Sequence, residues 1–340
     1  MHPDMELGWV HLSVADLERS AAFYEGVVGL QILRRSPGFI VMGVEKDGAT
    51  GSQPVPLVLL THWPGAQPKP AHCRGLYHFA LCLPTRRDLA RAAVRLVRRR
   101  WPIDGAADHW VSEAIYLLDP DGHGIELYAD RPRDQWPRRG EKILMTTEPL
   151  DWDGLMTELP PEERRPGIHD DHAGSDSKLN GMPSGTRLGH IHLHVSSLER
   201  AERFYREALG LDLVLRFGSG ALFFSAGGYH HHIGANIWVG QDAPPPPSNT
   251  VQLLHFSLVL PSLDDVLDLA RRLGQARAPV ESLAHLGLEV IESVVLKAPV
   301  SRKTELQEGF VTRDEDGFAI AVVSAGGRRL ERSKVKDQAT

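Results

Sequence analysis

The chain has 340 residues, of which 42% are hydrophobic and 24% are charged, and its formal net charge at pH 7 is −6. This is a globular composition, and the length predicts two domains. The acidic balance disfavours a nucleic-acid partner. No apolar stretch approaches the ~18 residues of a membrane span, and two cysteines, Cys73 and Cys82, cannot form a disulfide framework, so we expect a cytoplasmic protein without a membrane partner.

The first of four related segments covers residues 7–62. Within it, GWVHLSVADLERSAAFYEGVVGL at 8–30 begins with strand-like alternation and continues as an amphipathic helix that we expect to end near Gly29. A related stretch, GHIHLHVSSLERAERFYREALGL, stands at 189–211 and predicts a helix that ends near Gly210. The chain therefore contains an internal repeat.

The second segment, residues 76–130, has the same order of elements in a shorter form. A strand, YHFALCL at 77–83, precedes a helix predicted at 86–100. LLDPDGHGIELY at 117–128 then places an Asp-Gly turn between apolar runs, which predicts a hairpin.

Residues 131–187 are rich in proline, glycine and charge, and we interpret them as a linker with one short helix near Asp153–Leu159. The third segment follows at 188–240. A proline-rich loop, DAPPPPS at 242–248, leads from it to the fourth segment.

The fourth segment covers residues 252–325. It combines a strand, LHFSLVL at 254–260, a helix predicted at 263–273, and a second Asp-Gly hairpin, TRDEDGFAIAVV at 312–323. Residues 326–340 are expected to form a polar tail.

Strand, helix and about three further strands thus occur four times in order. The predicted fold class is α+β, with four tandem βαβββ modules in two open β-barrel-like domains at 1–130 and 188–325. This organisation resembles the vicinal-oxygen-chelate superfamily of glyoxalases, extradiol dioxygenases and resistance proteins. Four segments resemble its catechol 2,3-dioxygenase group in particular: GLYHFAL at 75–81, DPDGHGIELYADRP at 119–132, GHIHLHVSSL at 189–198 and GGYHHHIGANIW at 227–238.

The resemblance implies metal ligands at the start of a module's first strand, and in its last strand four residues after the turn glycine. His78 and Glu126 occupy both positions in the second module, and His190 occupies the first position in the third. The first module has Trp9 there, while the fourth has His255 but Ala321 in place of a carboxylate.

Two metal sets follow from these positions. His78, Glu126 and His190 form one set if modules two and three share a barrel and modules one and four share the other, a pairing that the linker is long enough to permit. The alternative set is His190 with His255, without a carboxylate. Two histidines and a carboxylate are typical of non-haem Fe(II) oxygenases, and Mn(II) accepts the same ligands.

The resemblance also implies catalytic residues. We expect His232 to act as the acid/base histidine, with His231 as the alternative, and His109 and Tyr116 to donate hydrogen bonds to the substrate. The expected function is extradiol ring cleavage of a catechol-type aromatic diol with Fe(II) and O2, in a homo-oligomer. The sequence does not identify the ring substituents.

Three other functions remain open. A glyoxalase-like metal-dependent isomerase or lyase usually has two carboxylates, whereas only Glu126 is evident. A hydroquinone dioxygenase would keep the iron, and a non-enzymatic small-molecule binding protein would lack the metal set. Among the other histidines, His192 and His194 either support the ligands or fill the barrel, and His123 is expected to be solvated in a turn.

Overall fold

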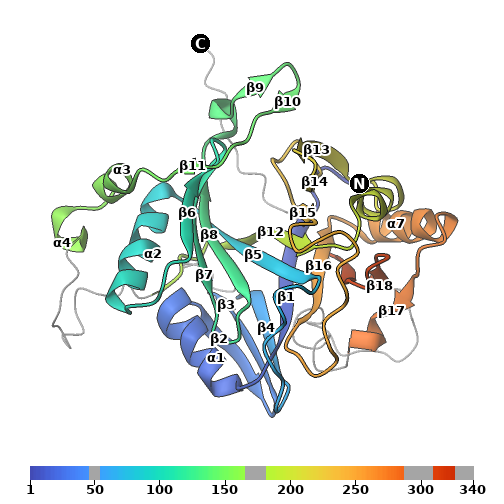
Figure 1. Ribbon diagram of the computed structural model, residues 1–340, viewed down its shortest axis with the longest axis horizontal. Helices are drawn as coiled ribbons and strands as arrows, with labels where there is room; N and C mark the ends of the chain where they lie inside the picture. Colours follow the sequence, from blue (N-terminus) through green and yellow to red (C-terminus); the bar gives the residue numbers. More distant parts are fainter. Residues whose placement is uncertain (46–53, 165–180, 287–308, 326–340) are drawn as a thin grey trace.

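The computed structural model describes residues 1–45, 54–164, 181–286 and 309–325 (Figure 1). Two curled β-sheets and the helices that cover them form an α+β fold. The eight-stranded sheet has the order β17-β18-β19-β16-β1-β4-β3-β2, and the nine-stranded sheet has the order β11-β6-β7-β8-β5-β12-β15-β14-β13.

The nine-stranded sheet contains β5 (Gly75–Leu83), β6 (Gly105–Asp108), β7 (Ser112–Leu118), β8 (Gly124–Asp130), β11 (Glu148–Pro149), β12 (Arg187–His194), β13 (Asp212–Phe217), β14 (Ala221–Ser225) and β15 (Ile233–Asn236). The eight-stranded sheet contains β1 (Glu6–Val14), β2 (Gln31–Ser36), β3 (Phe39–Val44), β4 (Val55–His62), β16 (Leu253–Leu260), β17 (Glu281–Ser282), β18 (Gly309–Arg313) and β19 (Ala319–Ser324). A small ribbon pairs β9 (Arg138–Arg139) with β10 (Lys142–Ile143).

Each large sheet combines one module from each half of the chain. β5 of the second module pairs antiparallel with β12 of the third, while β1 of the first module pairs antiparallel with β16 of the fourth. The predicted exchange of module partners is confirmed. The sheets therefore do not coincide with the sequence ranges 1–130 and 188–325.

The helices begin where the sequence offers a capping side chain. Asp16 caps α1 (Leu17–Phe23), and Thr85 caps α2 (Arg86–Arg98). Ser262 and Asp265 form a reciprocal capping box at the start of α7 (Leu263–Gln275). The predicted helices at 86–100 and 263–273 are confirmed as α2 and α7.

The two repeated helices end in a wider turn. α1 continues as the π-helix η1 (Tyr24–Val28), and α6 (Leu198–Glu202) continues as η3 (Arg203–Ala208). Gly29 and Gly210 follow with φ of 90° and 79°, a conformation that glycine adopts without strain, so both predicted helix ends are confirmed.

Hydrogen bonds from these helices hold each half of the chain together. The Tyr24 hydroxyl donates to Asp119 in the hairpin turn of the second module (3.0 Å), and the Tyr205 hydroxyl donates to Asp314 in that of the fourth (2.7 Å). All four side chains are buried. Sheets thus join modules across the halves, whereas tyrosine–aspartate pairs join them within a half.

The described parts of the predicted linker, residues 131–164 and 181–187, contain regular secondary structure. Its β11 pairs antiparallel with β6 at the edge of the nine-stranded sheet, and α3 (Trp152–Thr157) confirms the short helix predicted near Asp153–Leu159. A further turn of helix, α4, covers Pro161–Arg164. None of the helices in the described ranges is long and apolar enough to cross a membrane.

Candidate metal centre

The three predicted ligands come from adjacent strands in the middle of the nine-stranded sheet. Glu126 lies on β8, His78 on β5 and His190 on β12. Glu126 and His190 flank Ala80 in register on either side, and His78 is two residues from Ala80 on the same face of β5. The small Ala80 side chain leaves space between the three larger ones.

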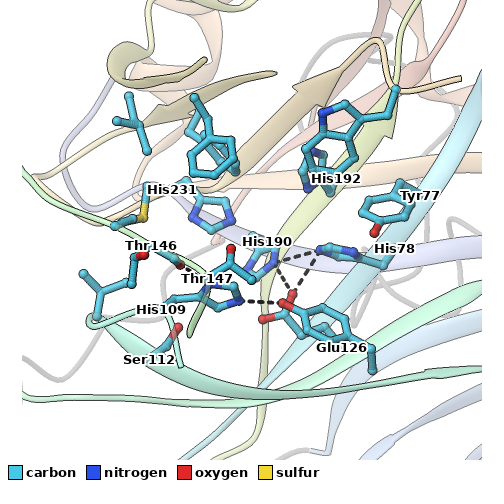
Figure 2. A pocket seen from close by; sticks show the side chains of 17 residues that line it. Tyr77, His78, His109, Ser112, Glu126, Thr146, Thr147, His190, His192 and His231 are labelled. Atoms are coloured by element: carbon cyan, nitrogen blue, oxygen red, sulfur yellow. Dashed lines mark hydrogen bonds and ion pairs between the residues drawn. The ribbon is translucent and has the colours of Figure 1, made fainter. Parts of the chain in front are cut away.

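The donor atoms of the three ligands converge (Figure 2). Glu126 Oε2 lies 3.0 Å from Nε2 of His78 and 3.0 Å from Nε2 of His190, and the two Nε2 atoms lie 3.2 Å apart. Ligand atoms about 2.1 Å from a metal and at right angles lie about 3 Å apart. The near-equilateral triangle therefore fits one face of an octahedral metal site, with the other face free.

Burial and charge favour a divalent cation at this triangle. Burial alone would raise the pKa of Glu126, but His190 and His78 outweigh it and hold the pKa well below its usual value. Burial lowers the pKa of His190 to about 4, so its imidazole is neutral at pH 7. One carboxylate and lone pairs on imidazole nitrogens are ligands that first-row divalent metals accept.

A cavity of about 220 Å³ opens next to the triangle. Side chains of β5, β7, β12, β13 and β14 line it, and so does the segment Met145–Thr147 of the predicted linker. Tyr77, Phe217 and Trp238 line the cavity with exposed fractions of 40%, 42% and 50%, which places them at its mouth.

The predicted hydrogen-bond donors His109 and Tyr116 both line this cavity. His109 Nδ1 lies 2.6 Å from the carbonyl oxygen of Thr146, and since a carbonyl only accepts, this nitrogen carries the proton. His109 Nε2 therefore accepts from the Tyr116 hydroxyl, 2.7 Å away, when the imidazole is neutral. Burial, followed by the charge of Glu126, raises the pKa of Tyr116 well above its usual value, so the phenol keeps its proton.

The structure separates the two candidate acid/base histidines. His231 lines the cavity, with its ring centroid 4.1 Å from that of His190. His232 is not among the cavity-lining residues, and its Nδ1 accepts from the backbone N–H of Ala226 (3.3 Å). Neighbouring residues in an extended segment point to opposite sides. The position in the cavity wall therefore favours the alternative, His231, over His232 as the candidate acid/base residue.

A buried chain of hydrogen bonds runs behind His231. His230 Nε2 lies 2.9 Å from the Asp130 carboxylate, and His230 Nδ1 lies 2.8 Å from His231 Nδ1. The carboxylate, which also pairs with Arg187 (3.0 Å), only accepts, so His230 donates from Nε2 and accepts at Nδ1. His231 then carries its proton on Nδ1 and keeps a lone pair on Nε2.

The eight-stranded sheet has no comparable set at the equivalent positions. Trp9 Nε1 donates to His255 Nε2 (3.0 Å), and His255 Nδ1 lies 3.3 Å from His11 Nδ1. His11 Nε2 lies 2.7 Å from the hydroxyl of Thr61. The nitrogens of His255 thus face Trp9 and His11, and the alternative pair of His190 with His255 is not brought together.

Two further histidines have defined places. His192 lines the cavity, and its Nε2 accepts from the Asn236 amide (3.0 Å), whose oxygen accepts from His194 Nδ1 (2.6 Å). His123 was expected to be solvated but is buried, and its Nε2 donates to the carbonyl of Ser13 (3.0 Å). That contact joins two modules, so the local turn pattern does not reveal it.

Most of the cavity wall was not predicted from the sequence. The unpredicted residues are Tyr77, Val111, Ser112, Met145, Thr146, Thr147, Leu215, Phe217, Phe223 and Trp238. Leu215 and Phe217 are two residues apart on one face of an edge strand, with Arg216 between them, and this apolar alternation was the available signal. The place of 145–147 depends on long-range pairing of β11 with β6, for which the sequence has no local pattern.

The chain was compared with known proteins. The family model of the glyoxalase/bleomycin resistance protein/dioxygenase superfamily matches residues 6–127 and 187–322. Catechol-2,3-dioxygenase of Bacillus subtilis (strain 168) is 40% identical over 304 residues, which cover 88% of this chain and 96% of the relative.

Two solved structures show the same fold. One, from Bacillus subtilis subsp. subtilis str. 168, has a TM-score of 0.56 and 14% identity, and covers 95% of this chain and 86% of its own. Glyoxalase I from Zea mays has a TM-score of 0.52 and 14% identity, with 94% and 92% covered.

Proposed function

The chain belongs to the glyoxalase/bleomycin resistance protein/dioxygenase superfamily, and from that membership we propose that it is an extradiol dioxygenase that opens catechol-type rings with O2. One observation carries the proposal: Glu126, His78 and His190 converge at mutual distances of 3.0 to 3.2 Å beside a cavity. The 40% identical relative named catechol-2,3-dioxygenase supports this reaction among those of the superfamily.

We propose Fe(II) as the metal, held by His78, His190 and Glu126. Two histidines and one carboxylate on one face are typical of non-haem iron oxygenases, and Mn(II) accepts the same set. When bound, the iron would supply Lewis-acid activation of the diol and the redox chemistry with O2. The triangle itself is buried, so the metal would face only the cavity side.

His231 is the proposed base for the diol. Its Nδ1 is committed to His230, so the free lone pair on Nε2 can take a hydroxyl proton from a substrate in the cavity. Burial, then the neighbouring histidines, hold the pKa of His231 well below its usual value, so the ring is unprotonated at pH 7 but weakly basic, and a bound metal would have to acidify the diol hydroxyl. Asp130 and His230 orient the ring for this transfer.

Tyr116 and His109 would stabilise negative charge on the substrate from the opposite wall. With His109 neutral, the Tyr116 proton is directed to His109 Nε2, so donation to a substrate oxyanion requires the O–H bond to rotate from His109 toward the cavity. The hydroxyl oxygen already lies in the cavity wall, so this rotation is the only rearrangement that the donor needs.

The other candidate reactions have less support from the site. A glyoxalase-like site needs a second carboxylate, and Glu126 is the single carboxylate among the described residues that line the cavity. A binding protein without metal would bear the desolvation cost of burying the Glu126 carboxylate and two imidazoles without using them for catalysis. A hydroquinone dioxygenase shares the ligand set, so the product must distinguish it.

The test is O2 uptake by Fe(II)-loaded protein supplied with catechol or with hydroquinone. We expect catechol-dependent uptake with a yellow ring-opened semialdehyde as product. Uptake with hydroquinone alone would support the hydroquinone dioxygenase. Protein that binds iron stoichiometrically but takes up no O2 with either diol would contradict the proposal.

A further inference from the structure

We infer that the substrate is a diol with an uncharged, apolar substituent, which packs against Leu215, Phe217, Phe223 and Trp238. This inference rests on the proposed function and narrows its substrate class. It follows from two independent features of the cavity, namely the absence of a cation from its described wall and the arrangement of β13.

The cavity offers no partner for a second anionic group on the substrate. Among the described residues that line it there is no lysine or arginine, and the one carboxylate, Glu126, belongs to the metal triangle. Two further ring nitrogens in the wall are already engaged, since His192 Nε2 accepts from the Asn236 amide (3.0 Å) and His231 Nδ1 lies 2.8 Å from His230 Nδ1. A carboxylate on the ring would lose its hydration without a counter-charge.

The alternation of β13 produces an apolar wall. Leu215 and Phe217 line the cavity, and Phe223 of the adjacent β14 lies opposite Leu215 in register. Arg216 stands between the two apolar residues, is not among the cavity-lining residues, and pairs with Glu202 (2.6 Å). The one cation of this strand is therefore directed away from the substrate.

Aromatic side chains extend this wall from the metal triangle to the mouth. The ring centroid of His192 lies 5.1 Å from that of the ligand His78 and 5.3 Å from that of Trp238. Trp238 in turn lies 5.4 Å from Tyr77. Large aromatic side chains left exposed beside a cavity mark a place where an apolar group binds.

Two diols of nearly the same shape test the inference. 4-Ethylcatechol and 3,4-dihydroxyphenylacetate carry a two-carbon substituent at the same ring position, but only the second carries a carboxylate. We expect metal-loaded protein without O2 to bind 4-ethylcatechol about tenfold more tightly or better, and kcat/KM to follow the same order. Equal Kd values would overturn the inference.

A cation introduced into the cavity wall provides a second test of the inference. Phe217→Arg is expected to improve the Kd for 3,4-dihydroxyphenylacetate relative to 4-ethylcatechol, whereas the uncharged Phe217→Gln is not. Trp152→Arg is the matched control for net charge, because Trp152 is similarly exposed (38% against 42%) but lies on α3 outside the cavity lining. The same gain in Trp152→Arg, or no gain in Phe217→Arg, would contradict the inference.

Unsubstituted catechol separates this inference from the proposed function. If the protein binds catechol and consumes O2 with it but shows equal affinity for the two substituted diols, the result would support the proposed dioxygenase function and contradict the inferred preference for an apolar substituent. Failure to bind or consume any of the three diols would contradict the proposed function itself.

Discussion

Three consecutive histidines, His230 to His232, differ in role because the chain turns each ring to a different neighbour. His231 lines the cavity, His230 bridges it to Asp130, and His232 accepts from the backbone of Ala226. The sequence indicates that one of them acts as acid/base, but not which, because the direction of each ring depends on the loop that leads into β15.

Replacement of His231 tests its role directly. We expect His231→Gln to lower kcat about 100- to 10,000-fold, the usual contribution of a general base, with metal content unchanged. Steady-state kinetics and iron analysis provide the measurements. The matched control is His232→Gln, for which we expect little change in kcat. The reverse order of effects would restore His232 as the base.

His230 is expected to act by positioning its neighbour. His230→Phe keeps a ring against Tyr229 but removes both hydrogen bonds, and Asp130 retains Arg187 and the Tyr229 hydroxyl as partners. We expect kcat to fall about tenfold or more while KM changes little, since the diol does not contact this residue. An equal effect on KM, or a loss of bound iron, would indicate a structural role instead.

At the scale of elements, the local patterns predicted the structure well. Helices with capping residues and hairpins with Asp-Gly turns appear where the sequence places them, because both depend on residues close in the chain. The π-turns at Tyr24 and Arg203 were not predicted. Each is the final turn of its helix, so too few helical residues follow it for the apolar pattern to reveal the wider turn.

The tyrosine–aspartate pairs link these elements and can be tested one at a time. Tyr24→Phe removes the hydroxyl that donates to buried Asp119, and we expect the free energy of unfolding to fall by about 1–3 kcal/mol. Urea unfolding measures the change. Tyr77→Phe removes a half-exposed hydroxyl and should change stability by about 0.5 kcal/mol or less. Equal stability of both variants would contradict the account of the pair.

At the scale of the whole molecule, the arrangement of the modules was the least predictable feature. The length of 131–187 permits modules two and three to share a sheet, and ligand positions favour it, but the pairing of β5 with β12 involves residues more than a hundred positions apart. The place of residues 145–147 in the cavity wall depends on a second pairing between distant residues, that of β11 with β6. Pairing between such distant residues produces no periodic pattern in the sequence.

Buried histidines should make the metal-free protein sensitive to acid. Burial lowers the pKa of His11 and of His232 from 6.5 to about 3, so each is neutral in the folded state and takes up a proton more readily when unfolded. Their contribution to the free energy of unfolding is complete above pH 6.5. It is lost as pH falls toward 3, by about 1.4 kcal/mol per pH unit for each histidine.

Two buried carboxylates work in the opposite direction. Burial raises the pKa of Asp119 and that of Asp314, the latter from 3.8 to about 6, so these groups add stability as pH falls. Burial also lowers the pKa of His190 and of His194 to about 4, so the buried histidines outweigh the carboxylates, and we expect the urea midpoint to drop between pH 6.5 and 4.5. A midpoint that stays constant or rises over this range would show that these histidines are charged in the folded protein.

The most direct measurement of the central claim is iron content, determined anaerobically, for three variants at the repeated ligand positions. Glu126→Gln and His190→Gln should each lose near-stoichiometric iron, because the first replaces the anionic ligand with a neutral amide and the second removes the imidazole nitrogen. His255→Gln, at the equivalent position of the other sheet, should retain it. Iron retained in Glu126→Gln and lost in His255→Gln would contradict a metal centre built from the second and third modules.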